Sequence, residues 1–354
     1  MRAVRKLKPG SDNIALCDIP EPGIQHPDDV KIAVQCGGLC GTDLHIQHGG
    51  YGFCAPVTLC HEFSGDVVDV GKNVDLVKPG DRVTIMPSAS GACGHCRYCQ
   101  VGEYFFCPQR NSVGSMRDGG FADYCVVPQT LVFPLPNSVS YEAAALVEPL
   151  ACCVKAISLN THIAPGDVVL VSGPGPIGLM CAVLAQKAGG RVVVCGTHRD
   201  ADRLQKAHEL GAERIVNVLS ENVVDIARNL SDGGADIVID CAGSAGSVNQ
   251  CLEAVRPTGT FVQVALIDQP IQADWGKIIY KQLRVHGSIA QNWASWHRAL
   301  DLVKSNAIDL TAFVSHRLPI EDWQQAFDGA EQQQGLKYLL CPSYPIPSAA
   351  SISA

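Results

Sequence analysis

A loop between residues 91 and 107 carries four closely spaced cysteines: Cys93, Cys96, Cys99 and Cys107. Four thiolates at this spacing can close a tetrahedral shell around zinc, and a shell with no open position serves structure instead of catalysis. Buried packing cysteines or two disulfides are the alternative, and the spacing fits neither of the usual ferredoxin runs. We therefore predict a structural zinc site in this loop.

Three other segments carry residue types that ligate a different, open zinc. They contain Cys40 in Gly-Leu-Cys-Gly-Thr-Asp, His61-Glu62 in Cys-His-Glu-Phe-Ser-Gly, and Glu148 in Val-Glu-Pro-Leu. Each is a weak signal alone, because a lone cysteine usually packs in a core and a lone glutamate is usually solvated. An open zinc lowers the pKa of a bound hydroxyl towards neutrality, which prepares an alcohol for oxidation.

A glycine-rich turn follows the apolar run at residues 168–172 and opens a predicted helix. In that context the pattern predicts a dinucleotide site, because its glycines allow a tight turn, close approach of backbone to pyrophosphate and close helix–strand packing. A flexible surface loop is the alternative. The residues expected at the cofactor are Gly173, Gly175, Pro176, Ile177 and Gly178.

The end of the second strand of such a unit separates NAD from NADP, because an acidic residue there bonds the ribose hydroxyl and repels a 2′-phosphate. Here the position holds Gly196, followed by Thr197, His198 and Arg199. Loss of the carboxylate beside a hydroxyl, an imidazole and a guanidinium favours NADP. NAD remains open, because Asp200 or Asp202 could fold back to this position.

The elements that must position these groups show two different sequence patterns, one in each part of the chain. Residues 1–150 are rich in glycine, proline and short β-type runs, at 30–34, 65–70 and 81–85, which predicts an irregular β domain. From residue 167 strands and helices alternate, which predicts a parallel sheet covered on both faces. The expected strands are 168–172, 191–195, 236–240, 260–265 and 283–287, and the expected helices are 177–188, 204–210 and 294–304.

Composition narrows the class of protein. The chain has 354 residues, enough for two domains, and its 47% hydrophobic and 18% charged residues predict packed cores and not disorder. A net charge of −8 without a Lys/Arg cluster argues against nucleic-acid or anionic-membrane partners. No apolar run reaches membrane-spanning length, and residues 1–8 resemble a first strand and not a signal peptide. Seventeen cysteines, an odd number, then favour a reducing, cytoplasmic location over a disulfide framework.

Taken together, these motifs resemble the zinc-containing medium-chain dehydrogenase/reductase family. The segment at 38–45, the His-Glu pair, Lys-Pro-Gly-Asp-Arg-Val at 78–83, the cysteine loop and Gly-Pro-Gly-Pro-Ile-Gly at 173–178 follow that family's order and spacing over nearly the whole chain. Glu148-Pro149-Leu150 resembles the sorbitol (polyol) dehydrogenase branch, where glutamate replaces the third-ligand cysteine of classical alcohol dehydrogenases.

The resemblance implies an α/β protein with a GroES-like, β-rich catalytic domain, residues 1–150 completed by 290–354, and a Rossmann doubly wound parallel-sheet domain at 151–289. It implies an active site in the cleft where zinc meets the nicotinamide, and a homo-oligomer, either dimer or tetramer. The catalytic zinc is expected on Cys40, His61 and one or both of Glu62 and Glu148. Thr42 is expected to accept the alcohol proton, His45 to pass it on, and Arg203 to contact the adenosine end.

Several positions depart from the family pattern. Cys60 stands where glycine usually precedes His-Glu. Cys152 and Cys153 follow Glu148 by about one helical turn, where a thiolate could compete with Glu148 for the metal, but core packing is the role expected of both. Ala290 or Gln291 replaces an arginine that anchors polyol hydroxyls in sorbitol dehydrogenases, and residues 273–280 look more like threonine dehydrogenase.

The function expected is therefore hydride transfer between a secondary alcohol (a polyol, sugar alcohol or sugar acid) and NAD(P). The alternatives are an L-threonine 3-dehydrogenase, a zinc-free quinone or enoyl reductase on the same fold, and a non-catalytic cofactor-binding protein. Retention of Cys40, His61, Glu62 and Glu148 argues against a zinc-free enzyme, and retention of Thr42 argues against a non-catalytic relative.

Overall fold

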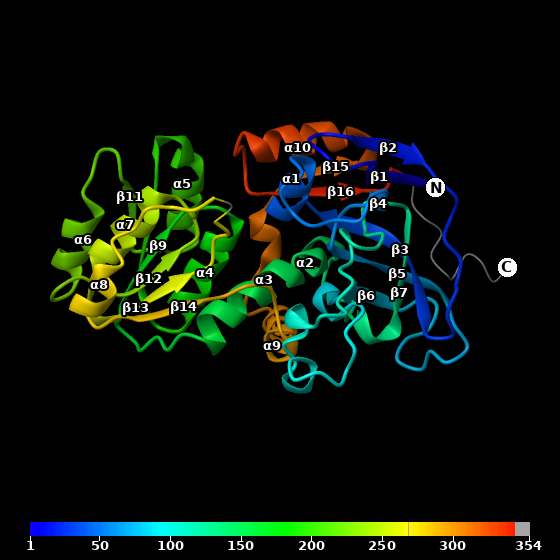
Figure 1. Ribbon diagram of the computed structural model, residues 1–354, viewed down its shortest axis with the longest axis horizontal. Coiled ribbons are helices and arrows are strands. Elements are labelled where there is room, and N and C mark those ends of the chain that lie inside the picture. Colours follow the sequence, from blue (N-terminus) through cyan, green and yellow to red (C-terminus); the bar gives the residue numbers. More distant parts are fainter. Residues whose placement is uncertain (268, 344–354) are drawn as a thin grey trace. The chain divides into compact units, whose positions relative to one another are not determined.

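A computed structural model describes residues 1–267 and 269–343 and divides the chain into two compact units (Figure 1). The first unit comprises Met1–Ala151 together with Gln291–Ala354, and the second comprises Cys152–Ala290. The chain therefore leaves the first unit once and returns to it. The Pro-, Ser- and Ala-rich sequence at 342–354 predicts a frayed tail, and from residue 344 onward this segment lies outside the described residues.

The first unit is built on a seven-stranded sheet of order β15-β16-β3-β5-β6-β8, with β7 also paired to β3. A three-stranded sheet of order β2-β1-β4 accompanies it. The strands are β1 (Arg2–Lys6), β2 (Ile14–Asp18), β3 (Asp29–Gly38), β4 (Val57–Thr58), β5 (Glu62–Val70), β6 (Arg82–Ile85), β7 (Tyr124–Pro128), β8 (Val132–Pro134), β15 (Val314–Pro319) and β16 (Lys337–Cys341). Because β16 runs antiparallel to β3, the C-terminal segment completes a sheet that the N-terminal segment begins.

This unit has helices within residues 1–150, where an irregular β domain was predicted, as well as the helix predicted at 294–304. Its helices are α1 (Gly41–Gln47), α2 (Tyr141–Ala145), α3 (Val147–Val154), which continues into the second unit, α9 (Trp293–Lys304) and α10 (Trp323–Glu331). The first two are too short to show a helical period in the sequence. Their starts are set by caps instead: Asp43 closes a capping box at Cys40, and the Ser140 hydroxyl accepts the Ala143 N–H at 3.1 Å.

The second unit contains one parallel sheet of order β11-β10-β9-β12-β13-β14. In chain order this is 3-2-1-4-5-6, the doubly wound arrangement that binds dinucleotides, so the predicted fold class is confirmed. The strands are β9 (Val168–Ser172), β10 (Arg191–Gly196), β11 (Arg214–Asn217), β12 (Ala235–Asp240), β13 (Val255–Gln263) and β14 (Arg284–Gly287).

The helices of the second unit cover its sheet. Helices α4 and α5 pack on β9, β10 and β11, whereas α6 and α7 contact each other and pack against β9 and β12. Every residue of β9 is buried, as expected of a central strand covered on both faces. The helices are α4 (Pro176–Lys187), α5 (Ala201–Glu209), α6 (Val223–Leu230), α7 (Ala245–Ala254) and α8 (Gly276–Tyr280).

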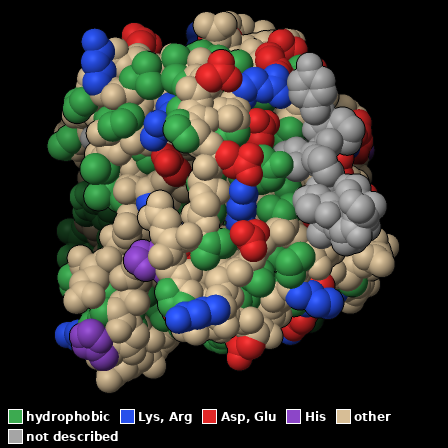
Figure 2. Space-filling view, turned by 90° about the vertical axis from the view of Figure 1, so that its right-hand side faces the viewer, with side chains coloured by type: hydrophobic (Ala, Val, Ile, Leu, Met, Phe, Trp, Pro, Cys, Tyr) green, Lys and Arg blue, Asp and Glu red, His purple; other side chains and the backbone are tan. Residues whose placement is uncertain are grey.

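The surface agrees with the charge pattern of the sequence. On the face shown in Figure 2, lysine and arginine side chains lie among aspartates and glutamates instead of gathering into one basic patch. Within the described part of the chain, no helix has the length and apolar character needed to cross a membrane.

Candidate active site

Cys40, His61 and Glu62 come together in the first unit. Cys40 is the N-cap of α1, and Glu62 begins β5 directly after His61. The Cys40 sulfur, a ring nitrogen of His61 and a carboxylate oxygen of Glu62 lie within 4.8 Å of one another. A thiolate, an imidazole and a carboxylate in a mostly buried setting are a donor set that suits zinc, so these residues fit the expected metal.

Glu148 lies outside that trio but belongs to the same electrostatic environment. It is buried near the start of α3 and carries 7% of its possible exposure. Burial acts to lower the pKa of His61, but the neighbouring Cys40 sulfur and the Glu148 carboxylate raise it well above its usual value. A cation at the imidazole is therefore favoured here, and a bound metal would supply that charge in place of the proton.

Thr42 and His45 lie three residues apart on α1, on one face of the helix. The Thr42 hydroxyl oxygen is 3.6 Å from the Cys40 sulfur, and both side chains are half-buried. This places a hydroxyl beside the trio of Cys40, His61 and Glu62. His48, one turn further on, is exposed, and its ring nitrogen forms a surface hydrogen bond with the Glu331 carboxylate at 3.0 Å.

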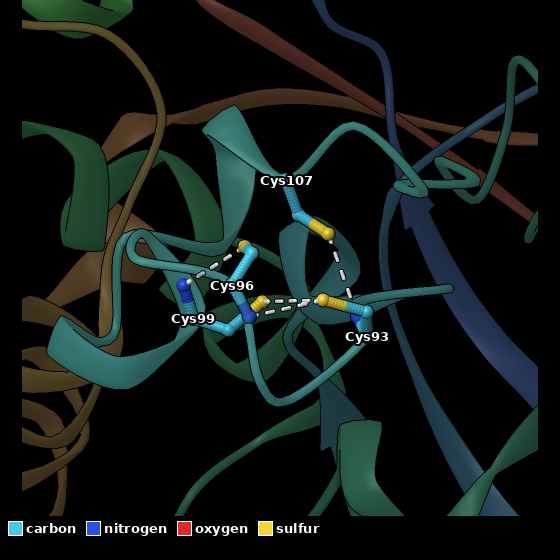
Figure 3. Close-up of side chains that lie close together, drawn as sticks. All are labelled: Cys93, Cys96, Cys99 and Cys107. Carbon is cyan, nitrogen blue, oxygen red and sulfur yellow. Dashed lines mark hydrogen bonds between the residues drawn. The ribbon is translucent and has the colours of Figure 1, made fainter.

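The cysteine loop forms a second donor cluster, shown in Figure 3. The sulfurs of Cys93, Cys96, Cys99 and Cys107 lie within 4.8 Å of one another and point toward a common centre. The Cys93 backbone N–H donates to the Cys107 sulfur at 3.4 Å and lowers the pKa of that thiol to about 7. Four convergent thiols, three of which already accept amide hydrogens from within the loop, fit the chemistry of a closed zinc shell.

The dinucleotide motif has the expected backbone in the second unit. Gly173 ends β9 with φ +97°, a left-handed conformation that glycine adopts without strain. A Cβ on Gly178 would lie 1.9 Å from the Gly173 carbonyl oxygen, so close packing of helix on turn requires glycine there. Gly175 is the N-cap of α4 and Pro176 its first residue, followed by Ile177, so free amide groups at the helix start face the turn.

Comparison with known proteins decides the family. Residues 26–137 match the alcohol dehydrogenase GroES-like domain, and residues 176–305 match the zinc-binding dehydrogenase domain. A sorbitol dehydrogenase of Halalkalibacterium halodurans is 39% identical over 97% of this chain and 99% of its own length. The chain belongs to the zinc-containing medium-chain dehydrogenase family. It is accordingly an oxidoreductase that uses zinc and a nicotinamide dinucleotide.

Other family members show the same full-length match. A D-arabitol-phosphate dehydrogenase of Enterococcus avium is 37% identical over 96% of this chain and 97% of its own length. An L-threonine 3-dehydrogenase of Cronobacter sakazakii is 33% identical over 96% of this chain and 99% of its own. Among solved structures, a zinc-binding dehydrogenase of Sinorhizobium meliloti bound to NADP superposes with a TM-score of 0.86, at 35% identity, covering 96% of this chain and 99% of that one.

In this medium-chain dehydrogenase, the residues that follow β10 are those that the sequence assigns to the choice between NAD and NADP. Asp200 folds back towards the strand end, which is one of the two alternatives that the sequence left open. Its carboxylate accepts hydrogen bonds from the Thr197 N–H and hydroxyl, both at 2.9 Å. That carboxylate would also lie 3.0 Å from a Cβ on Gly196, so it occupies the space beside the glycine. His198 and Arg199 are exposed and Arg203 is half-buried on α5.

Two buried charged residues near the site, Lys337 and Asp43, were not predicted from the sequence. Lys337 on β16 donates to Glu62 at 2.7 and 2.5 Å and to the Leu39 carbonyl at 3.0 Å. Asp43 is fully buried and accepts the backbone N–H of Cys40 at 3.0 Å and of Cys60 at 3.1 Å. Asp43 had a local signal, as an acidic residue three positions after a helix cap. Lys337 had none, because it lies 275 residues from its partner.

The structure also explains the departure at Cys60. This residue has φ +79°, in the left-handed region where glycine is usual. A cysteine there costs about 1 kcal/mol or more of backbone strain, which the surrounding fold must overcome. Its sulfur is buried and contacts the carbonyls of Gly38 and Glu62, at 3.6 and 3.3 Å, so it packs as part of the core. The Cys153 thiol likewise donates to the Ile177 carbonyl at 3.5 Å within the second unit.

Proposed function

We propose that this dehydrogenase oxidises a secondary hydroxyl group of a polyol, sugar alcohol or sugar acid to a ketone, with NADP⁺ preferred over NAD⁺ as the hydride acceptor. The observation that carries the proposal is the convergence of Cys40, His61 and Glu62, with Glu148 buried nearby. Glutamate at 148, and relatives that are polyol or polyol-phosphate dehydrogenases, support a polyhydroxylated substrate.

Cys40 and His61 would hold the catalytic zinc, with a carboxylate completing the protein ligands. We assign that position to Glu148, because Lys337 donates to both carboxylate oxygens of Glu62. Glu62 is the alternative ligand. When bound, zinc polarises the substrate oxygen and favours loss of its proton. The thiols of Cys93, Cys96, Cys99 and Cys107 would hold a second, structural zinc.

Thr42 would accept the hydroxyl proton, since its own hydroxyl lies beside the Cys40 sulfur. His45 lies on the same face of α1 and would receive the proton next and release it to solvent. A hydroxyl alone is a poor base, so the pair acts by relaying a proton and not by storing it. Asp43 holds the Cys40 and Cys60 amides and thereby orients the two ligand segments.

The preference for NADP rests on the side chains exposed after β10. Arg199 and His198 are exposed, whereas the Asp200 carboxylate already accepts two hydrogen bonds from Thr197. The Arg199 guanidinium would bind a 2′-phosphate, and the Thr197 donors reduce the repulsion between that phosphate and Asp200. Glycines 173, 175 and 178 with Pro176 and Ile177 would face the pyrophosphate, and Arg203 the adenosine end.

A substrate panel tests the proposal directly. The zinc-loaded enzyme is mixed with polyols, sugar acids and L-threonine, each with NAD⁺ and with NADP⁺, while the absorbance of the reduced cofactor is followed. Turnover of a polyol or sugar acid, faster with NADP⁺, is the expected result. Turnover of threonine alone with NAD⁺ would contradict both parts of the proposal.

Zinc content separates the remaining alternatives. The proposal requires one catalytic and one structural zinc per chain, measured by atomic absorption on dialysed protein. A single zinc per chain with activity on quinones or enones would support a zinc-free reductase. Dinucleotide binding without turnover of any alcohol would support a non-catalytic role.

We also propose that the enzyme is a cytoplasmic homo-oligomer, a dimer or a tetramer. All seventeen cysteines are free thiols, which suits a reducing compartment. In the described residues β14 pairs only with β13 and so leaves an open sheet edge in the second unit. Val285 on that strand is 40% exposed, and Ile279 and Tyr280 on the preceding helix α8 are 81% and 91% exposed, which is the kind of apolar edge that another chain covers.

A further inference from the structure

Two thiols outside the metal clusters face each other in the first unit. Strands β16 and β3 pair antiparallel at Leu339–Gly38 and Leu340–Gly37, so the next pair in this register is Cys341 opposite Cys36. Their sulfurs are 3.1 Å apart, and both residues are buried. Directly opposed residues on antiparallel strands have Cα atoms about 4.5 or 5.5 Å apart, within the roughly 4.4–6.8 Å that a disulfide spans.

A cation makes the two thiols unequal. The Arg317 guanidinium on β15 donates to the Cys341 sulfur at 3.4 Å and lies 3.5 Å from the Glu142 carboxylate. The hydrogen bond from the Cys36 thiol, together with Arg317, keeps the pKa of Cys341 below its usual value although burial opposes this. The same hydrogen bond raises the pKa of Cys36. The pair therefore contains one activated sulfur, that of Cys341, and one protonated sulfur, that of Cys36, which can react with Cys341 in a second step.

We propose that Cys36 and Cys341 form a peroxide-reactive modification site that oxidises reversibly to a disulfide between β3 and β16. Cys341 keeps 5% of its possible exposure, and a small oxidant would reach it along Arg317, whose side chain touches Cys341 and is 61% exposed. Thiolate character, a neighbouring cation and an adjacent resolving thiol are the features that make a cysteine pair reactive towards oxidants.

The chemistry balances with a hydroperoxide as the oxidant. The Cys341 thiolate attacks the peroxide, so an S–O bond forms, the O–O bond breaks, and an alkoxide or hydroxide leaves and takes a proton from water. The Cys36 sulfur then attacks the Cys341 sulfenic acid, so the S–S bond forms while the S–O bond breaks. The departing hydroxide takes the Cys36 proton and leaves as water. Two cysteines are oxidised by two electrons in total, and one peroxide is reduced.

The disulfide would act on a strand that holds the active site. Strand β16 also carries Lys337, whose ammonium binds Glu62, and it meets β3 at only two paired positions in the described residues. Strand β3 leads directly to Cys40. A covalent link at the third position would fix β16 against β3, so oxidation is expected to raise the melting temperature of the protein by several degrees.

The experiment is a peroxide titration of the zinc-loaded protein. Free thiols are alkylated after each addition, the protein is digested without reductant, and peptides are identified by mass spectrometry. Released zinc is followed with a chromogenic chelator in parallel. We expect a peptide pair linked through Cys36 and Cys341, reversed by dithiothreitol, to form before zinc is released. Because the readout is a mass and not turnover, the result is independent of the proposed substrate.

Matched variants assign the order of events. Cys36→Ser should stop the reaction at a Cys341 sulfenic acid that dimedone traps, and Cys341→Ser should give no adduct on Cys36. Arg317→Met, a change at an exposed side chain that leaves both thiols in place, should slow disulfide formation about tenfold. Cys125→Ser removes a buried thiol of the same unit whose sulfur donates to the Asp118 carbonyl at 3.6 Å, and should leave the rate unchanged.

Two outcomes would overturn the proposal. One is oxidation of the four-cysteine loop, with loss of zinc, before any Cys36–Cys341 link forms. The other is an Arg317→Met variant that forms the link as fast as the parent protein. The second test does not depend on the cysteine variants folding, since Arg317→Met retains the whole core.

Discussion

Glu62 and Lys337 form an ion pair with almost no solvent contact, since their side chains are 0% and 4% exposed. Burial acts to lower the pKa of Lys337, but the Glu62 carboxylate raises it above its usual value, so the lysine stays charged. Each charge is stable there only because the other is present. A carboxylate held in this way stays close to Cys40 and His61 without being committed to a metal.

Lys337→Met should therefore leave an uncompensated carboxylate in the core. We expect a loss of about 3–5 kcal/mol in the free energy of unfolding, measured by urea denaturation with zinc present. The double variant Glu62→Gln/Lys337→Met removes both charges and should recover part of the loss. A single variant as stable as the parent would show that water or the metal compensates Glu62 instead.

Arg199→Ala tests the cofactor assignment at the residue level. Loss of the guanidinium should lower kcat/KM for NADP⁺ about tenfold, equivalent to about 1.4 kcal/mol, with little change for NAD⁺. Lys187→Ala is the control, since it removes an exposed positive charge from the other end of α4 in the same unit. Equal losses for both cofactors would mean that Arg199 does not contact a 2′-phosphate.

At the scale of elements, the cysteine loop depends on its metal. Residues 91–107 contain only two short 3-10 turns, η2 (Cys99–Val101) and η3 (Tyr104–Phe106), and their backbone N–H groups donate to carbonyls within a few residues, so no sheet or long helix orders the segment. Metal binding then supplies the order that a sheet or a long helix would otherwise give.

Cys96→Ser should accordingly lower the zinc content by one per chain and make the loop the first site of proteolysis. The loss of one thiolate from a closed shell weakens zinc binding and exposes the segment. Cys17→Ser, a half-buried thiol on β2 outside both clusters, should keep the parental zinc content. Unchanged zinc content in Cys96→Ser, measured by atomic absorption, would rule out this shell.

The sequence predicted elements where the local pattern was strong. The run at 168–172 matches β9, and helix 294–304 differs from α9 by one residue, because long or fully apolar segments carry their own signal. Helices α1 and α2 were missed because each is shorter than two helical turns. Within the site, Cys40, His61 and Glu62 were found by motif, whereas Lys337 was not, because only pairing of β16 with β3 brings it to Glu62.

At the scale of the whole molecule, the open edge of the second unit is the feature that most needs a partner. Strand β14 exposes Val285, and the preceding helix α8 exposes Ile279 and Tyr280. A free apolar edge in a stable protein invites pairing with an identical edge, because the same strand from a second chain offers matching hydrogen bonds and apolar surface. The protein should therefore sediment as a dimer or larger at micromolar concentration.

Val285→Lys should weaken that association, because a charge on the edge strand must be desolvated when two edges meet. We expect the dissociation constant to rise at least about tenfold, or about 1.4 kcal/mol, measured by analytical ultracentrifugation. Leu219→Lys is the matched control: Leu219 is 66% exposed and follows β11, at the opposite edge of the same sheet. If only Leu219→Lys dissociates the protein, the β11 edge forms the interface. If the parent protein is a monomer, the β14 edge avoids pairing with another chain without being covered by one. Arg284 and His286, which flank Val285 on β14, would then be the first residues to test for that protection.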